Sequence, residues 1–167
     1  TREAFTAPEI QRTNLAAVIL RTINLRLGKI DEFPFLDPPR STTVREGYKT
    51  LEELGAITPE GEMTQVGRRM AKLPVDPRIS RMILAAVDEH ALPEVLAIAA
   101  LLESQDPRER PVEKQQAADE AHRKFYNRDS DFLTILNLWD AWHDKQKTSS
   151  HSRVRKWCQQ NFLSYMR

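Results

Sequence analysis

Glycine and cysteine are both scarce in this sequence, with five glycines and a single cysteine, Cys158, among 167 residues. None of the glycines belongs to a G-x-x-x-x-G-K-[ST] loop, so the chain has no element of this type to cradle a nucleoside triphosphate. One cysteine excludes an internal disulfide framework and fits a reducing compartment, so we expect a cytoplasmic protein. The four histidines are far apart along the chain, which argues against a zinc cage.

Long apolar runs are missing as well. The longest one extends from Val95 to Leu102, far short of the roughly 20 residues that a membrane-spanning helix needs. The first residues show no basic-then-apolar signal pattern. An apolar fraction of 40% and a charged fraction of 29% are typical of a folded domain with a hydrophobic core. We therefore expect a folded monomer without a membrane partner.

Acidic residues are absent from the last part of the chain, although the net charge of the whole is only +1. Residues 75–144 carry eight basic and 14 acidic side chains, whereas residues 145–167 carry six basic and no acidic ones. Such a charge step is typical of a surface that binds a polyanion. A basic helix that packs on the preceding acidic helices would explain the same pattern, and the sequence leaves both interpretations open.

The first predicted helix begins at a capping box formed by Thr6 and Glu9, and an apolar stripe continues to Leu27. Gly28 is expected to end this helix. The segment 33–39 contains three prolines, which restrict their own backbone and that of the preceding residues, so it is predicted to be a loop.

A second helix is predicted over residues 43–54, with a capping box completed by Glu46 and with Gly55 as the C-cap. Two short strands around the turn at 58–61 then predict a small hairpin. Helix, helix and hairpin follow each other in the order of a winged helix, and we assign residues 1–74 to such a domain.

The remainder, residues 75–167, is predicted to be an all-α bundle, so that the whole chain is mainly α. Helix starts are marked by proline or by a capping residue, at Asp76-Pro77, Pro93, Pro111, and Asp129 or Ser130. A last helix follows the polar break at 147–150 and continues through Tyr165 without a C-cap. We therefore expect the chain to be part of a longer one.

The tetrapeptide Asp119-Glu120-Ala121-His122 has the letters of a DEAH ATPase box. That box needs a buried parallel strand in front of it, which aims the two carboxylates at Mg²⁺ and at the attacking water. Here good helix formers precede it after Pro111, so the segment is predicted to be a helix with solvated carboxylates. Because a phosphate loop is also missing, we expect no catalytic site and no cofactor in this chain.

Several other side chains suit either a structural or a binding role. For Trp139 and Trp142, core packing is favoured over base stacking, because both extend an apolar stripe. Arg108 and Arg110 are expected to tie loops to carboxylates. His122 is expected to be a hydrogen-bonded histidine at the edge of the bundle.

The candidates for nucleic-acid contact lie in the acid-free tail. They are Arg153, Arg155, Lys156 and Asn161. The three cations suit phosphates. Asn161 has the reach for a backbone or a base, with a local hydrogen bond as its default interpretation.

Several ordered motifs resemble the region that follows the motor in bacterial DEAH-box RNA helicases of the HrpA type. The resemblance covers nearly the whole chain. Its motifs are Glu9-Ile-Gln-Arg-Thr-Asn-Leu-Ala-Ala-Val-Ile-Leu20, Phe33-Pro-Phe-Leu-Asp-Pro-Pro39, Leu51-Glu-Glu-Leu-Gly-Ala-Ile57, Asp106-Pro-Arg-Glu-Arg-Pro111, Ser130-Asp-Phe-Leu-Thr-Ile-Leu-Asn-Leu-Trp139 and Trp157-Cys158-x-x-Asn161-Phe162-Leu163.

The resemblance implies a winged helix followed by a helical ratchet domain, with an OB-fold beyond residue 167. In this family two RecA-like domains bind ATP and Mg²⁺ and hydrolyse the nucleotide. The ratchet helices and the OB-fold help to close a channel around single-stranded RNA. The implied partners are therefore single-stranded RNA, held weakly by this region alone, and the RecA-like and OB-fold domains of the parent chain.

Two other functions remain open. A free-standing winged-helix regulator would bind duplex DNA through the helix at 43–54, although Glu46, Glu52 and Glu53 suit a phosphate-lined groove poorly. A helical adaptor that binds only protein would fit the nearly neutral charge.

Overall fold

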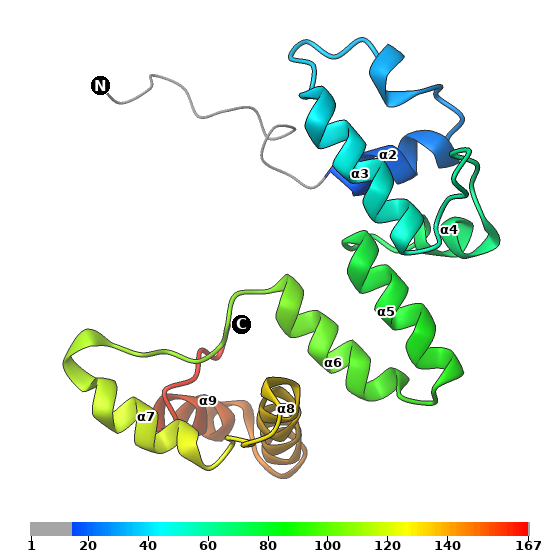
Figure 1. Ribbon diagram of the computed structural model, residues 1–167. Helices are drawn as coiled ribbons and strands as arrows, with labels where there is room; N and C mark the ends of the chain where they lie inside the picture. Colours follow the sequence, from blue (N-terminus) through cyan, green and yellow to red (C-terminus); the bar gives the residue numbers. More distant parts are fainter. Residues whose placement is uncertain (1–14, 167) are drawn as a thin grey trace, which may run out of the picture. The chain divides into compact units, whose positions relative to one another are not determined.

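The computed structural model describes residues 15–166 (Figure 1). The predicted capping box at Thr6 and Glu9 lies outside these residues. The chain divides into two compact units, one ending at Asp88 and the other beginning at Glu89. We call the described parts of these units the first unit (15–88) and the second unit (89–166). Both are mainly helical, as the sequence predicts.

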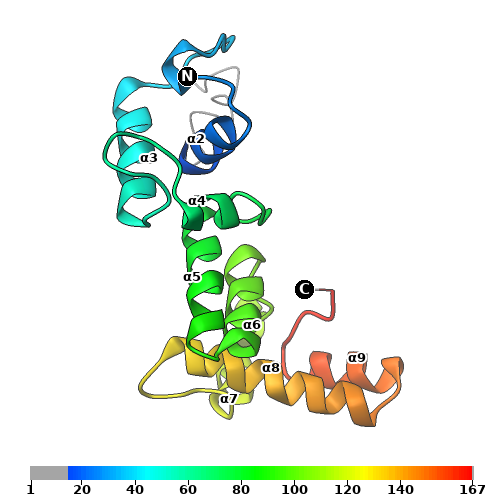
Figure 2. The same ribbon diagram turned by 90° about the vertical axis from the view of Figure 1, so that its right-hand side faces the viewer.

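The first unit is built on two helices that lie side by side, α2 (Leu15–Asn24) and α3 (Ser41–Glu53) (Figures 1 and 2). Gly47 permits their close approach, because a Cβ atom there would lie 2.6 Å from Ile19 Cδ1 and 3.2 Å from the Ala16 backbone nitrogen. The short 3-10 helix η1 (Ile30–Glu32) adds Ile30 to the core between them. The other buried core residues of this unit are Leu15, Ala16, Ile19, Leu20, Val44, Leu51, Ala56, Ile57 and Met70.

The predicted end of the first helix at Gly28 is wrong. α2 ends at Asn24, and Arg26 takes up the left-handed conformation with φ = 56°. The backbone N–H of Leu27 then donates to the carbonyl of Thr22 at 3.1 Å, which closes the helix end as glycine commonly does.

The predicted start of the second helix is also wrong, whereas its end is confirmed. α3 begins at Ser41, two residues early, and its N-cap Arg40 makes no side-chain capping bond, so Glu46 completes no capping box. At the other end, Gly55 adopts φ = 67°. The N–H of Ala56 reaches the carbonyl of Leu51 at 2.8 Å, as in a Schellman motif.

The predicted hairpin is reduced to a bridged turn. Ile57 and Met63 form a single antiparallel bridge, and the Thr58 N–H donates to the Glu62 carbonyl at 2.8 Å. Neither Ile57 nor Met63 belongs to an extended strand. The turn leads into α4 (Gln65–Met70), a helix that the sequence analysis missed.

A capping residue and a glycine hold α4 in place. Thr64 accepts a hydrogen bond from the Gly67 N–H at 3.0 Å and donates to the Gly55 carbonyl at 2.6 Å. A Cβ atom at Gly67 would lie 2.0 Å from the Ala56 carbonyl oxygen, so only glycine fits there.

The first unit ends with α5 (Pro77–Asp88). As predicted, Asp76 caps it, and its Oδ1 accepts from the Arg78 N–H at 2.8 Å. α5 contacts α4, and Leu84 packs against the first unit's core. These contacts explain why the compact units divide after residue 88. The domain boundary that we place after residue 74 stays a prediction.

The second unit contains α6 (Leu92–Glu103), η2 (Val112–Lys114), α7 (Gln115–Arg123), α8 (Asp131–Thr148) and α9 (His151–Gln160). The helix starts lie close to the predicted ones, and Ser130 rather than Asp129 caps α8. α8 contacts both α6 and α9 (Figure 2). The buried core residues of this unit's apolar cluster are Phe125, Leu138, Val154, Cys158 and Leu163.

The predicted extension of the last helix through Tyr165 is wrong. α9 ends at Gln160, because Phe162 adopts φ = 51° and the Leu163 N–H donates to the Cys158 carbonyl at 2.9 Å. The segment beyond then pairs with the loop before α7, where the Ser164 N–H donates to the Pro107 carbonyl at 2.7 Å. Within residues 15–166, no helix combines the length and apolar character required to cross a bilayer.

Candidate nucleic-acid interface

The three predicted cationic contacts, Arg153, Arg155 and Lys156, are exposed on α9. The helix is fixed from its other side by Val154 and Cys158, which are 3% and 1% exposed. None of the three cations forms an ion pair with another residue in the part of the chain that the structure describes. Their charge is therefore not neutralised by the acidic helices of the same unit, and it remains available to a phosphate.

The three cations do not share one side of α9. Each residue of an α-helix advances by about 100°, so residues three or four apart lie on one side, and residues two apart do not. Arg153 and Trp157 are one turn apart on the same side, and Lys156 lies at its margin. Arg155 lies on the opposite side.

Asn161, the fourth candidate, is turned inward. Its side chain is 5% exposed, and its amide nitrogen donates to the Trp157 carbonyl at 2.7 Å. Its amide oxygen accepts from Lys124 Nζ. The bond to Trp157 is the local hydrogen bond that was the default interpretation, and the bond to Lys124 is a tertiary one. A contact between the Asn161 side chain and a nucleic-acid strand would require that these bonds break.

The tetrapeptide at 119–122 lies on α7, as predicted. Arg110 donates through Nε and Nη2 to the two carboxylate oxygens of Asp119, each at 2.7 Å. These hydrogen bonds lower the pKa of the exposed Asp119 carboxyl. Glu120 pairs with Arg123 at 3.1 Å. Both carboxylates are thus held by guanidinium groups. Residues 15–166 contain no cluster of three His, Cys, Asp or Glu side chains suited to a metal ion.

The loop before α7 is held by polar side chains in the way the sequence predicts. Arg108 Nη2 donates to Asp106 Oδ2 at 2.6 Å, which lowers the pKa of that carboxyl. His122 Nε2 hydrogen-bonds the Phe162 carbonyl oxygen at 3.0 Å, and since a carbonyl only accepts, this nitrogen carries the proton. Arg108 and Arg110 line a cavity of about 690 Å³, but both are engaged by carboxylates.

The tryptophans of α8 serve mainly packing. Trp142 packs against the core of the second unit, as predicted. Trp139 lies 5.6 Å from it between ring centroids and stacks on His143 at 5.5 Å.

Sequence reasoning missed a basic and aromatic groove between α8, α9 and the end of α7. Its volume is about 420 Å³, and its lining residues are Lys124, Phe125, Ala141, Asp144, Lys145, Thr148 and Trp157. Lys124 Nζ lies 5.0 Å from the Phe125 ring centroid and 6.0 Å from that of Trp157. The adjacent Lys124 and Phe125 were a weak signal, but only the fold brings Lys145 and Trp157 to them.

Comparison with known proteins places these elements in a family. Residues 48–75 match the winged-helix model of the helicase associated domain (HA2), and residues 76–135 match the ratchet-like model of the same domain. The chain is an HA2 region of the HrpA type.

Two relatives match this HA2 region over its full length. The chain is 51% identical to "ATP-dependent RNA helicase HrpA homolog" of Haemophilus influenzae and 45% identical to "ATP-dependent RNA helicase HrpA" of Escherichia coli. In both cases the match includes 100% of this chain and 13% of the relative. The HA2 region therefore corresponds to a small part of each of these helicases.

Proposed function

We propose that this HA2 region belongs to a longer ATP-dependent DEAH-box RNA helicase, a cytoplasmic monomer. In that protein it forms one wall of the channel for single-stranded RNA and couples the motion of the motor to translocation of the strand. The catalytic steps, with ATP and Mg²⁺, belong to RecA-like domains elsewhere in the parent chain. The names of the two relatives support this proposal.

The observation that carries the channel-wall role is the set of unpaired cations on α9. Arg153, Arg155 and Lys156 are exposed, and no described carboxylate neutralises them. Contacts with phosphates need no sequence code, which suits a protein that moves along RNA. Such a wall would hold one side of the strand, so affinity in isolation is expected to be weak.

The organisation that we propose is a winged helix over residues 1–74 and a ratchet domain over residues 75–167, continued by an OB-fold. The matched ranges, which meet between residues 75 and 76, support this division. The bridged turn at 57–63 is the counterpart that we assign to the wing.

The experiment replaces Arg153, Arg155 and Lys156 by alanine in the full-length protein. The log–log slope of RNA affinity against salt should become shallower by about 0.7 for each phosphate that the variant no longer binds. RNA unwinding should fall more than basal ATP hydrolysis. An unchanged slope, together with a loss of folding stability, would refute the role in RNA binding and favour pairing within the protein.

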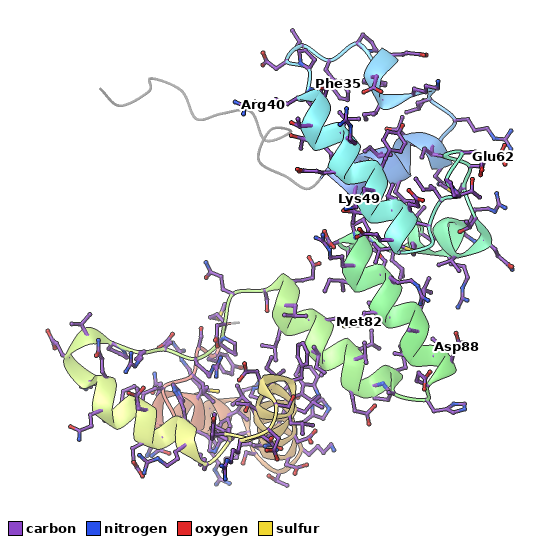
Figure 3. The ribbon with its side chains drawn as sticks, in the orientation of Figure 1. Phe35, Arg40, Lys49, Glu62, Met82 and Asp88 are labelled. Carbon is purple, nitrogen blue, oxygen red and sulfur yellow. The ribbon has the colours of Figure 1, made fainter. Side chains whose placement is uncertain are left out.

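A control pair of substitutions tests the duplex-binding alternative. Arg45 and Lys49 belong to α3. Lys49, which is labelled in Figure 3, already pairs with Glu53 at 3.7 Å. Alanine at both positions should leave RNA affinity unchanged. A selective loss of duplex DNA binding in this double variant would indicate the winged-helix regulator instead. If neither this variant nor the triple variant of α9 changed the binding of RNA or of duplex DNA, the protein adaptor would be favoured.

A further inference from the structure

The groove between α8, α9 and the end of α7 has the chemistry of a nucleic-acid site. Two ammonium groups, Lys124 and Lys145, line it together with the half-buried ring of Trp157. Positive side chains next to an aromatic surface recur in proteins that hold single strands, since the cations meet phosphates and the ring meets a base or a sugar. The groove is open to solvent. Its lining residues do not include the four contacts predicted from the sequence, Arg153, Arg155, Lys156 and Asn161.

Lys124 is preorganised for this purpose. Its Nζ is bonded to Asn161 Oδ1 and lies over the Phe125 and Trp157 rings, so its position is fixed from several sides. A cation that is already held in place loses less conformational entropy when it meets an anion than a free lysine does. The buried amide of Asn161 thus has a positioning role here, through Lys124.

The charge balance of the groove is positive. Asp144 is the carboxylate among its lining residues, and Lys147 lies 3.9 Å from it. Lys145 forms no ion pair with another described residue. Arg153, one turn before Trp157 on the same side of α9, extends the positive surface along the helix.

We propose that this groove is the place where the second unit holds single-stranded RNA. Lys124, Lys145 and Arg153 contact consecutive phosphates, and Trp157 supports a base or a ribose. Arg155, on the far side of α9, is not among the residues that line this groove. This inference rests on the proposed function and sharpens it, because it selects among the cations of α9 and adds two lysines from other elements.

The test uses the full-length protein and a fluorescein-labelled oligouridylate, with affinity measured by anisotropy over a range of salt concentrations. Arg153→Ala and Arg155→Ala form a matched pair, since each removes one arginine from the same helix. We expect Arg153→Ala and Lys145→Ala each to make the log–log slope of RNA affinity against salt concentration shallower by about 0.7. Arg155→Ala should change the slope less than Arg153→Ala does, and Arg153→Lys should retain the slope of the unsubstituted protein because the cation is kept.

A second readout locates the strand directly. An oligouridylate that carries 5-iodouridine, irradiated on the protein, should become crosslinked to the peptide that contains Trp157. Equal salt slopes for Arg153→Ala and Arg155→Ala would overturn the assignment of RNA to the groove. The absence of a crosslink to this peptide would do the same, and either result would leave the proposed function intact. Absence of single-stranded RNA binding by the unsubstituted protein would overturn both.

Discussion

The first unit and the second unit of this HA2 region are each stabilised internally by a different kind of interaction. In the first unit, α2 and α3 approach closely at Gly47, and α4 meets the Ala56 carbonyl at Gly67, around a core that includes Leu15, Ile19 and Leu51. Substitutions that change volume should therefore decide its stability, because neither close approach leaves room for an added carbon atom.

The second unit has a smaller apolar cluster and relies on polar side chains to fix its loops. Thr134 accepts from the Asn127 N–H at 2.9 Å, and Asn137 donates to the Phe125 carbonyl at 3.1 Å. Arg108 and Arg110 hold the loop before α7 to Asp106 and Asp119. Removal of a hydrogen bond should thus matter more here than removal of volume.

The largest effect is expected from Leu51→Ala in the first unit. Leu51 is fully buried in the core, so its truncation should cost about 2–5 kcal/mol of unfolding free energy. Urea unfolding followed by circular dichroism measures this loss. Leu36→Ala is the control, since that side chain is fully exposed and should change the value by less than about 0.5 kcal/mol. Similar values for both variants would contradict a volume-dependent first unit.

A smaller effect is expected from Thr134→Val in the second unit. Valine has nearly the same shape, but it leaves the Asn127 N–H without its acceptor at a site that is 6% exposed. The cost should be about 1–3 kcal/mol. Tryptophan fluorescence reports on this unit selectively, because Trp139, Trp142 and Trp157 all belong to it. Thr148→Val, at the exposed end of α8, is the control, and an equal effect there would argue against a specific role for Thr134.

The pair of Asp106 and Arg108 predicts a pH dependence in the second unit. Hydrogen bonds from Arg108 hold the pKa of the Asp106 carboxyl below its usual range. A lowered pKa in the folded state means that the stabilisation is complete above the unfolded-state pKa of about 3.9 and is lost as the pH falls through the folded-state value. Since the pair is partly exposed, the effect should be modest.

Urea unfolding followed by tryptophan fluorescence at pH 7 and in steps below pH 4 measures the dependence. The difference between the unsubstituted protein and Asp106→Asn should be largest at pH 7 and should shrink as the pH falls. In an Arg108→Met background the difference should be small at every pH. A difference that grows toward acid would contradict the direction of the pKa shift.

The starts of α5 and α8 could be predicted from the sequence better than the ends of α2 and α9, although the start of α3 was missed. Asp76 and Ser130 mark the starts of α5 and α8 by local chemistry, and Gly55 marks one end. The ends at Arg26 and Phe162 were missed because side chains other than glycine adopt the left-handed conformation there. At Phe162 the cause is tertiary, since Leu163 is buried and the next residue pairs with Pro107.

The candidate site was predictable only in part for a related reason. The exposed cations of α9 follow from composition and helical spacing, and the sequence places them correctly on the surface. The groove depends on Lys124, Lys145 and Trp157, which come from three separate elements. The inward turn of Asn161 depends on Lys124, 37 residues earlier in the chain. Neither arrangement can be read from a local pattern.

The smallest effect is expected at the DEAH tetrapeptide, where the polar side chains of the second unit mimic a catalytic motif. The 167-residue chain should neither bind nor hydrolyse ATP, and Glu120→Gln should change nothing measurable, because Glu120 pairs with Arg123 on a solvated helix. A fluorescent ATP analogue and a phosphate-release assay measure binding and turnover. Asp119→Ala, which removes the partner of Arg110, provides the comparison and should be equally silent in both assays. Turnover that disappears in Glu120→Gln but persists in a variant at the exposed Glu113 would show that α7 performs chemistry. That result would refute our proposal that the catalytic steps belong to domains elsewhere in the parent chain.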